Sequence, residues 1–332
     1  MSNAQDFAKR ELSFLKDNHE HFLFEHLTKA YASARDLGYL SPEVLKDAES
    51  FKAWCEFLKV AAELDAGFAQ GVVLQLLTSV VTGTSEIHAF PAYSNPRSKE
   101  SSLSIEPPVN EKTTSDIILS GKIEALAFAG QTKRTLIAIQ DQFYTFDHDT
   151  SSVTQKKMNT LGARTCPLED IELKNMRAKL LTLPAEEKNS LWEKIYLGAA
   201  HVILGLCESS METAIDYANE RVQGGRKIMA WSEHKLQLAD YSVKTRAAAL
   251  MLSGCLAEPH AIGTDSARIA LLNLQELATD VTSFGVQALG GAGYMKDYLQ
   301  EKRFRDAHQL RSWFGSPQLT KINIFERTTH LG

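Results

Sequence analysis

The sequence lacks the features of a membrane protein and of a nucleic-acid-binding protein. No uninterrupted apolar run reaches the length of a membrane-spanning helix, and residues 6–11 include the charges DFAKRE in place of the apolar core of a secretion signal. The chain carries 36 Lys and Arg against 41 Asp and Glu, so the strong basic field that favours nonspecific nucleic-acid binding is missing. We therefore expect a cytoplasmic protein with no nucleic-acid partner.

Cysteine is also scarce. The four cysteines, Cys55, Cys166, Cys207 and Cys255, form no CxxC pair, and this spacing suggests neither a zinc site nor a disulfide framework. We expect no metal site, and free thiols fit a reducing compartment. What the sequence does contain is ordinary for a globular protein: 44% of its 332 residues are hydrophobic and 23% are charged, which is enough to build a large core.

Hydrophobic periodicity divides the chain into helical, β and helical segments. Apolar residues recur at helical spacing from Phe7 to about Ile87 and again after Pro184. Between them, residues 91–116 are rich in Pro, Ser, Asn and charge, which is typical of an exposed loop. Short β-type runs follow at 117–119, 135–139, 143–146 and 170–173. The pattern predicts an α+β fold with an N-terminal helical domain (1–88), a small antiparallel β domain (89–182) and a C-terminal four-helix bundle (183–332).

Two glycine-containing motifs lie in the C-terminal third. The first reads YANERVQGGRKI from Tyr217 to Ile228, and the second reads QALGGAGYMKDYLQEKRFRDA from Gln287 to Ala307. Glycines let backbone N–H groups approach a phosphate closely, and an arginine offers a fixed cationic fork. Alone, a GGxG motif more often marks a tight turn and an arginine a solvated helix surface. The two motifs together favour contact with a pyrophosphate.

These two motifs, in this order, resemble the hallmark motifs of the acyl-CoA dehydrogenase family. Weaker similarity at residues 60–67, 119–139 and 161–173 extends the resemblance over most of the chain. The resemblance implies the fold of that family, in which FAD lies between two subunits. It also implies the α,β-dehydrogenation of an acyl-CoA, with electrons passed to an electron-transfer flavoprotein.

The resemblance also assigns roles to individual positions. The residues that it implies for FAD contact are Arg221, Gly224, Gly225, Gln287, Gly290, Gly291, Ser316 and Gln318. Arg305 and Asp306, in the second motif, are expected to form a structural ion pair. His201 and His234 stand alone in the sequence, and we expect them to be packed or surface residues without a catalytic role.

The catalytic base of the family is missing. The reaction needs a carboxylate that removes the α-proton of the thioester, and the glutamate of most family members corresponds here to Phe314, within the segment Trp313 to Ser316. The position used by a minority of members corresponds to Ile195. Glu193 lies two residues earlier, which turns a helical side chain by about 200°. We therefore predict no catalytic residue in this chain.

The segments that contact the flavin ring in the family have also changed. A leucine, threonine, glutamate and proline segment followed by Gly-Ser corresponds here to residues 93–96 (YSNP) and 97–100 (RSKE). A strand with a tryptophan and a threonine against the ring corresponds to residues 126–129 (LAFA). The part of the site that serves a subunit's own flavin ring is thus altered. The Arg221 and Gln287 motifs, which serve the FAD of a neighbour in the family, are retained.

Three functions remain open at this point. The favoured one is a non-catalytic subunit of a hetero-oligomeric acyl-CoA dehydrogenase, which donates the pyrophosphate and adenosine half-site to the FAD of a homologous partner. Such mixed assemblies resemble those that act on bulky acyl-CoAs in fatty acid or steroid side-chain degradation. The alternatives are an active homo-oligomer with a relocated base, and a scaffold or acyl-CoA-binding protein without FAD.

Overall fold

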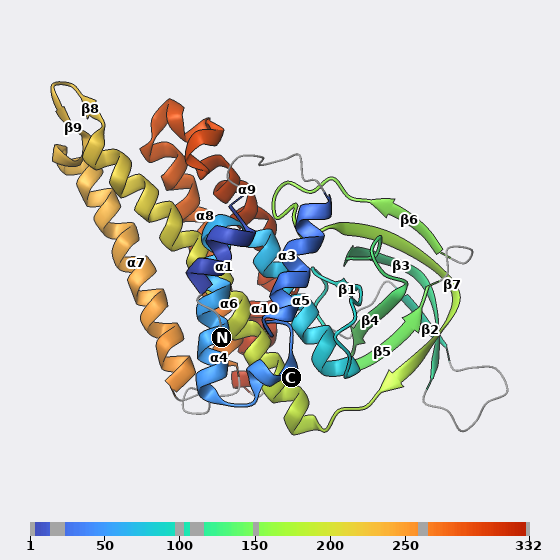
Figure 1. The fold of residues 1–332 in the computed structure, drawn as a ribbon. Helices are drawn as coiled ribbons and strands as arrows, with labels where there is room; N and C mark the ends of the chain where they lie inside the picture. The colour runs from blue at the N-terminus through green and yellow to red at the C-terminus, as the bar shows by residue number, and fades with distance from the viewer. Residues whose placement is uncertain are drawn as a thin grey trace.

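The structure, a computed structural model, describes residues 4–13, 24–96, 103–106, 116–148, 153–257 and 265–329. A β-sheet lies at one side of the molecule and helices occupy the rest (Figure 1). The N-terminal helices are α1 (Ala4–Glu11), α3 (Phe24–Asp36), the 3-10 helix η1 (Pro42–Leu45), α4 (Ala48–Leu64) and α5 (Ala66–Thr82). Aspartates begin two of these helices, because Asp47 and Asp65 accept backbone N–H groups of the first turns of α4 and α5.

The sheet is antiparallel in every pairing between its named strands. Its central path is β1-β3-β7-β5-β4, with β2 beside β3 and β6 beside β7. The strands are β1 (Phe90–Pro91), β2 (Leu103–Glu106), β3 (Ile117–Ala127), β4 (Arg134–Ile139), β5 (Gln142–Asp147), β6 (Val153–Lys157) and β7 (Leu168–Leu181). Residues of the sheet form an apolar core of their own, separate from that of the helices, which includes Leu119, Ile137 and Ile171.

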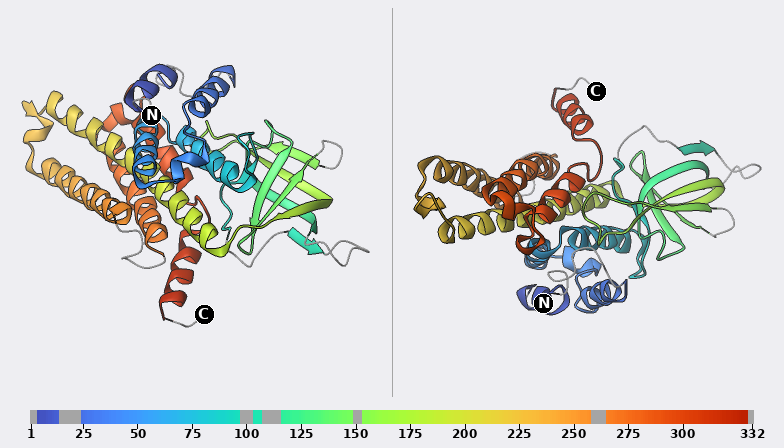
Figure 2. Two further views of the ribbon diagram at one scale, coloured as in Figure 1. Left: turned by 60° about the horizontal axis from the view of Figure 1, so that its bottom comes forward. Right: turned by 90° about the horizontal axis from the view of Figure 1, so that it is seen from above.

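The C-terminal part contains the longest helices. After α6 (36 residues) the chain turns through a short hairpin and returns, so that α6, α7 and α8 run side by side away from the sheet (Figure 1). Its elements are α6 (Ala185–Glu220), β8 (Val222–Gln223), β9 (Arg226–Lys227), η2 (Ile228–Ala230), α7 (Ser232–Ala257), α8 (Ser266–Ala288), η3 (Gly290–Tyr294), η4 (Lys296–Tyr298), α9 (Gln300–Leu310) and α10 (Pro317–Thr329). Helix α10 projects from the body (Figure 2).

The N-terminal helices and the bundle share one apolar core. Helix α4 packs closely on α6 at Gly205, where an added Cβ would lie 2.2 Å from the backbone oxygen of Lys59. Only glycine fits such an approach without moving the helices apart. Trp54 fills the neighbouring space, and its indole N–H donates to the Tyr39 carbonyl at 3.0 Å. The two helical segments of the sequence therefore form a continuous unit.

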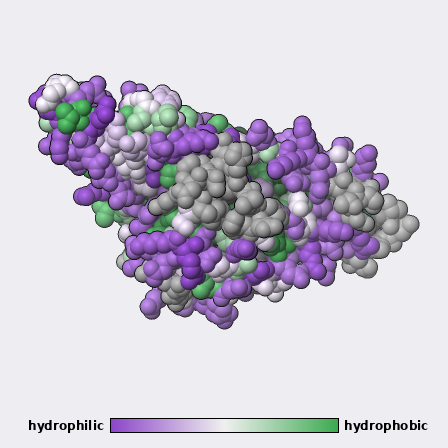
Figure 3. Space-filling model, turned by 45° about the horizontal axis from the view of Figure 1, so that its top comes forward, coloured by the Kyte–Doolittle hydropathy of each residue, from purple (hydrophilic) through white to green (hydrophobic). Residues whose placement is uncertain are grey.

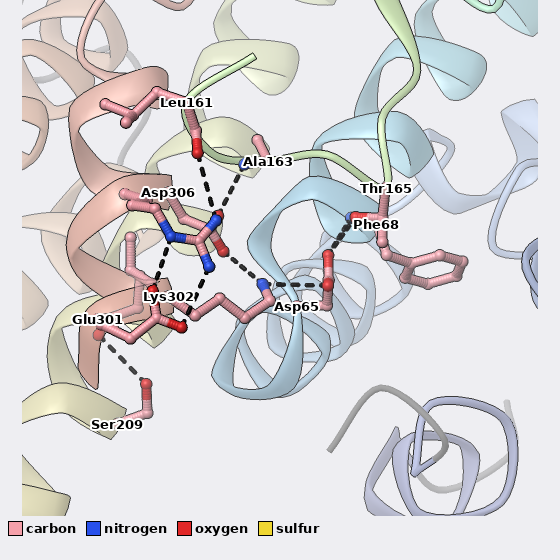
Figure 4. A network of polar contacts seen from close by, with 11 residues as sticks. Asp65, Phe68, Leu161, Ala163, Thr165, Ser209, Glu301, Lys302 and Asp306 are labelled. Atoms are coloured by element: carbon pink, nitrogen blue, oxygen red, sulfur yellow. Dashed lines mark hydrogen bonds and ion pairs between the residues drawn. The ribbon is translucent and has the colours of Figure 1, made fainter. Parts of the chain in front are cut away.

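A buried ion network fastens the start of α5 to α9 (Figure 4). The Lys302 ammonium lies 2.5 Å from a carboxylate oxygen of Asp306 and 3.1 Å from one of Asp65. Asp306 also accepts the backbone N–H of Ala163 at 2.7 Å, and Asp65 accepts the Thr165 hydroxyl. Burial alone would lower the pKa of Lys302, but the two carboxylates raise it above its usual value. The ammonium therefore stays charged inside the protein.

The observed fold confirms the predicted α+β class and the order of its segments. Each predicted β-type run lies in a strand, namely β3, β4, β5 or β7. The expectation of a loop over residues 91–116 was wrong in part, because β1 includes Pro91 and β2 covers Leu103–Glu106. Both short strands pair with β3. The pairing with this long strand therefore outweighs a local composition that is unfavourable for β-strands. Among the described helices, none has the length and apolar character to cross a membrane.

Candidate functional site

The two glycine motifs meet in one cleft of about 1110 Å³ at the end of the bundle. Its walls come from the end of α6, the β8–β9 hairpin, the start of α7 and the turn between α8 and η3. Figure 3 shows the hairpin end standing apart from the body at the upper left, with a notch beside it. Five of the predicted cofactor residues line the cleft: Arg221, Gly224, Gln287, Gly290 and Gly291. Positions that are more than 60 residues apart in the sequence are thus brought together.

The hairpin holds Arg221 at the mouth of the cleft. Arg221 ends α6, where its backbone N–H donates to the Tyr217 carbonyl at 2.8 Å and its carbonyl accepts the Ile228 N–H at 2.9 Å. The chain then reverses at Gly224 and Gly225, whose φ angles of 64° and 81° favour glycine. The Arg221 side chain is exposed. Its position is therefore fixed by the backbone while its guanidinium remains available to a ligand.

Trp231 forms part of the cleft wall, and the sequence analysis missed it. The guanidinium of Arg226 lies 3.6 Å from the centre of the indole ring, and the indole N–H donates to the Gln223 carbonyl at 3.3 Å. An added Cβ on Gly224 would lie 2.9 Å from the ring. Trp231 is 40% exposed, whereas the other three tryptophans are fully buried. An aromatic residue six positions after the GG pair was the available signal, but its meaning depends on the turn geometry.

The opposite wall is the turn that follows α8. Gly290 has a φ of 58°, and Gly293 approaches the Val286 carbonyl so closely that an added Cβ would lie 2.2 Å from it. Gln287, at the end of α8, is exposed to the cleft. His234 also lines the cleft, and partial burial lowers its pKa. Arg221 is thus the arginine of the cleft, and the carboxylates of Glu220 and Glu233 line the cleft as well. An arginine together with glycine backbone suits a phosphate-containing ligand.

Apolar side chains fill the two positions to which the sequence resemblance assigns the base of the family. Phe314 is 4% exposed and packs against Trp313, Tyr196 and Trp192, with ring centres 5.1, 5.5 and 6.1 Å away. Ile195 is fully buried on α6. The Phe314 backbone has a φ of 63°, and its N–H donates to the Ala92 carbonyl at 3.1 Å. These positions belong to a packed core, and neither offers a proton acceptor.

A second cleft, of about 660 Å³, lies between the sheet and α9. Its walls include Tyr93, Ser94 and Asn95, from a segment expected to face the flavin ring, and Gly315 and Ser316, from the segment that includes Phe314. Of the other ring-side residues, 126–129 are buried and 97–100 lie outside the described residues. An ion cluster that the sequence did not reveal also lines this cleft.

In this cluster the Lys122 ammonium lies 2.9 Å from an Asp170 carboxylate oxygen and 2.8 Å from one of Glu124. Each carboxylate is already engaged by a cation. The cluster therefore gives the second cleft a charged wall.

Three predicted cofactor residues, Gly225, Ser316 and Gln318, do not line the Arg221 cleft. Gly225 is at the tip of the hairpin. Ser316 lines the second cleft, and its hydroxyl donates to the Gln318 side chain at 3.2 Å on the exposed start of α10. The sequence resemblance grouped Ser316 and Gln318 with Arg221. Within one chain, however, Ser316 and Gln318 lie at a different place from the Arg221 cleft.

The other expected roles can be compared with the observed contacts. His201 is buried, its Nδ1 lies 2.7 Å from the Leu197 carbonyl, and burial lowers its pKa, so it is a packed histidine. The expected pairing of Arg305 with Asp306 is corrected. Arg305 pairs with Glu301 at 2.7 Å, and Asp306 pairs with Lys302, because successive residues of α9 point in different directions.

The residues that form the Arg221 cleft lie in a part of the chain that is similar to known proteins. Residues 195–329 match the profile of the acyl-CoA dehydrogenase C-terminal domain. Over these residues the chain is similar to the acyl-CoA dehydrogenase family. An acyl-CoA dehydrogenase of Bacillus subtilis is 34% identical over 131 residues, which cover 39% of this chain and 34% of that protein. Subunit CarC of the caffeyl-CoA reductase–Etf complex of Acetobacterium woodii is 29% identical over 130 residues, covering 39% and 34%.

The fold resemblance to acyl-CoA dehydrogenases extends further than the sequence similarity. Butyryl-CoA dehydrogenase from Megasphaera elsdenii superposes with a TM-score of 0.75 over 96% of this chain and 94% of that chain, at 18% identity. By sequence, however, the chain spans only 34% of the length of each of the two curated relatives described above. The acyl-CoA dehydrogenase fold is therefore shared throughout, while sequence similarity is concentrated in the part that contains the Arg221 cleft.

Proposed function

We propose that this chain is a non-catalytic subunit of a hetero-oligomeric, FAD-dependent acyl-CoA dehydrogenase. One observation carries the proposal: the Arg221 cleft is formed, whereas packed apolar side chains occupy both base positions of the same chain. The cleft would hold the pyrophosphate and adenosine of an FAD whose flavin ring belongs to a homologous partner. The oxidoreductase activity, the acyl-CoA substrate and the cytoplasmic location are parts of this proposal.

The residues of the cleft fit that group. Arg221 can donate two hydrogen bonds to phosphate oxygens, and the glycines of the α8–η3 turn leave space for phosphates near the backbone. The exposed indole of Trp231 provides an aromatic surface in the same cleft. When bound, FAD supplies the hydride acceptor for the β-carbon of an acyl-CoA. This chain would bind and orient the nucleotide half, and the partner would remove the α-proton.

The identities of the other components follow the family. The partner is a homologous acyl-CoA dehydrogenase subunit, and an electron-transfer flavoprotein is the expected electron acceptor. The similarity to a subunit of the caffeyl-CoA reductase–Etf complex of Acetobacterium woodii supports this acceptor. Bulky acyl-CoAs of fatty acid or steroid side-chain degradation remain the proposed substrate class.

The first test uses ADP as a probe of the cleft in the purified chain. Trp231 is the only tryptophan of the four with an exposed ring, so ADP binding should quench its fluorescence. A charge-assisted contact contributes about 1.5–3 kcal/mol, so Arg221→Ala should weaken ADP binding roughly tenfold to a hundredfold. Arg221→Lys should recover only part, because an ammonium lacks the planar fork. The control is Arg311→Ala, at an exposed position outside the cleft.

The second test measures FAD in the assembly. The chain is co-expressed with a homologous subunit that retains the base glutamate, and flavin absorbance is measured after dialysis. Wild-type complexes should keep FAD, Arg221→Ala complexes should lose it while remaining assembled, and Arg311→Ala complexes should match wild type. Equal FAD occupancy in wild-type and Arg221→Ala complexes would refute the half-site. In that case the scaffold function would be preferred.

A further inference from the structure

A buried arginine contacts a residue that lines the Arg221 cleft. Arg303, on α9, is only 9% exposed. Its Nη1 atom donates a hydrogen bond to the Thr213 hydroxyl at 3.0 Å and another to the Tyr298 carbonyl at 3.1 Å. Burial lowers the pKa of Arg303 to about 10, against the opposing effect of nearby carboxylates, so the guanidinium is charged at neutral pH. Burying a charge is unfavourable unless hydrogen bonds compensate for it, and the contacts of Arg303 therefore indicate which parts of the fold it connects.

Both contacts of Arg303 lead to the same pair of aromatic side chains. Tyr298 belongs to η4 and Tyr217 belongs to α6; both line the cleft, and their rings meet edge to face with centres 5.5 Å apart. Thr213, Tyr217 and Arg221 follow one another at intervals of four residues along α6, so they lie on one side of that helix. Arg303 is therefore hydrogen-bonded on both sides of the aromatic pair, to the backbone of Tyr298 and one helical turn away from Tyr217.

The turn between η4 and α9 depends on contacts of this kind. Leu299 has a φ of 59°, in the left-handed region that is unfavourable for a side chain such as leucine. On one side of Leu299, Arg303 binds the Tyr298 carbonyl. On the other side, Gln300 and Ser210 of α6 exchange two hydrogen bonds, of 2.8 and 2.9 Å. An unfavourable backbone conformation persists only where its surroundings hold it, and at Tyr298 that contact is made by Arg303.

We propose that Arg303 is a positioning residue of the Arg221 cleft, which holds the Tyr298 ring against Tyr217 and so keeps this wall ready for the nucleotide. Arg303 does not itself line the cleft, so it acts through Tyr298 and touches no ligand. A wall that already has its bound conformation need not be ordered when the nucleotide binds, and this increases the affinity. The inference rests on the proposed function, because it concerns the affinity of the same cleft.

The first experiment compares the ADP affinity of three variants of α9, with Trp231 fluorescence as the readout. Arg303→Met replaces the guanidinium by an apolar end, and it should bind ADP roughly threefold to thirtyfold more weakly than wild type. Arg303→Lys should bind more tightly than Arg303→Met, because both hydrogen bonds come from one nitrogen atom, which an ammonium can replace. The control is Lys302→Met. The Lys302 ammonium is buried on the same helix, but it pairs with Asp65 and Asp306, which do not line the cleft, so the ADP affinity should equal that of wild type.

A double-mutant cycle separates positioning from a general loss of structure. Tyr298→Ala removes the ring that Arg303 holds, so the addition of Arg303→Met to this variant should weaken ADP binding little further. Thr213→Val removes one of the two hydrogen bonds at similar side-chain volume. It provides a second test if Arg303→Met does not fold, and ADP should bind to it more weakly than to wild type.

The outcomes distinguish this inference from the proposed function. Additive losses in the double variant, or wild-type ADP affinity in both Arg303→Met and Thr213→Val, would overturn the role of Arg303. If Arg221→Ala still weakens ADP binding in the same experiments, the proposed function of the cleft stands. A wild-type chain that does not bind ADP would contradict both.

Discussion

Phe314 shows how one side chain changes the chemistry of this fold. Its ring belongs to an aromatic cluster with Trp192, Tyr196 and Trp313, so the substitution is embedded in the packing around it. The surrounding indoles and phenol leave the site apolar. A carboxylate introduced here would have to be buried among them, which favours its neutral form. We therefore do not expect a single substitution at this position to create a catalytic base.

We expect Phe314→Glu to destabilise the protein without creating activity. Loss of a buried phenylalanine costs about 3–5 kcal/mol, and burial of the new carboxyl adds to this cost. Urea unfolding should show the decrease, and an electron-acceptor assay with acyl-CoA should show no turnover. Phe325→Glu is the control, because Phe325 is 59% exposed on α10. A stable and active Phe314→Glu protein would show that the rest of the site is intact.

Glu63 makes stability depend on pH. Partial burial raises its pKa to about 7, with Lys59 opposing the shift and Glu208 and Glu212 adding to it. The folded protein thus keeps this proton to a higher pH than the unfolded chain does, and unfolding becomes easier as pH rises from about 4.5 to about 7. Glu63→Gln should raise the melting temperature at pH 8, with a gain that shrinks below pH 5. A gain of equal size at both pH values would contradict this account.

At the scale of elements, the ion network explains how helices that are distant in sequence are held together. Lys302 on α9 reaches Asp65 at the start of α5 and Asp306 one turn along its own helix. Removing one member of a buried ion pair leaves a charge without compensation, at a cost of about 3–5 kcal/mol. We therefore expect Lys302→Met to lower the free energy of unfolding by that amount in urea titrations.

The control for that variant is a lysine with the same type of contact at the surface. Lys321 lies 2.5 Å from Glu276, but both side chains are substantially exposed. Lys321→Met should therefore change the unfolding free energy by less than about 1 kcal/mol. Equal losses in the two variants would mean that burial does not distinguish the two ion pairs.

The sequence predicted the elements better than their contacts. Helical spacing around α6 and α8 and the β-type runs of β3, β4, β5 and β7 all depend on local periodicity, which is written in consecutive residues. Strands β1 and β2 were missed because their pairing with β3 is decided by a distant neighbour. The Lys302 network was missed for the same reason, since Asp65 and Lys302 are far apart in the chain.

The Arg221 cleft was predictable only in part. Its glycines and arginine were visible as motifs, since the required backbone turns select glycine locally. The place of Trp231 in the cleft, and that of Ser316 in the second cleft with Gln318 hydrogen-bonded to it, needed the three-dimensional structure. The motifs indicated what the cleft could bind, and the fold determined which residues surround it.

At the scale of the whole molecule, we expect the purified chain alone to be inactive. Both base positions are apolar and buried, so no ordinary acyl-CoA should reduce an electron acceptor in its presence. The assay needs added FAD, so that inactivity cannot be attributed to cofactor loss. Turnover by the pure chain, or a yellow homo-oligomer that retains FAD through dialysis, would favour the active homo-oligomer with a relocated base.

The thiols offer a check on the integrity of the whole fold. All four cysteines are buried, and burial raises the pKa of each. Buried protonated thiols react slowly, since the thiolate is the nucleophile. We expect an aromatic disulfide reagent to modify no cysteine in the native protein over minutes and all four in denaturant. Rapid modification of one native thiol would identify a region that opens.

The length of α6 has a consequence for the evolution of duplicated genes. Ile195 and Arg221 lie on this one helix, and its rise of about 1.5 Å per residue separates them by about 39 Å. A mutation at one end leaves the shape of the other unchanged. After duplication of a gene for such a protein, the product of one copy could therefore lose its catalytic function at the Ile195 end of the helix. The Arg221 end of the same helix would still be required by the product of the other copy. Selection would then retain the two genes only as a pair.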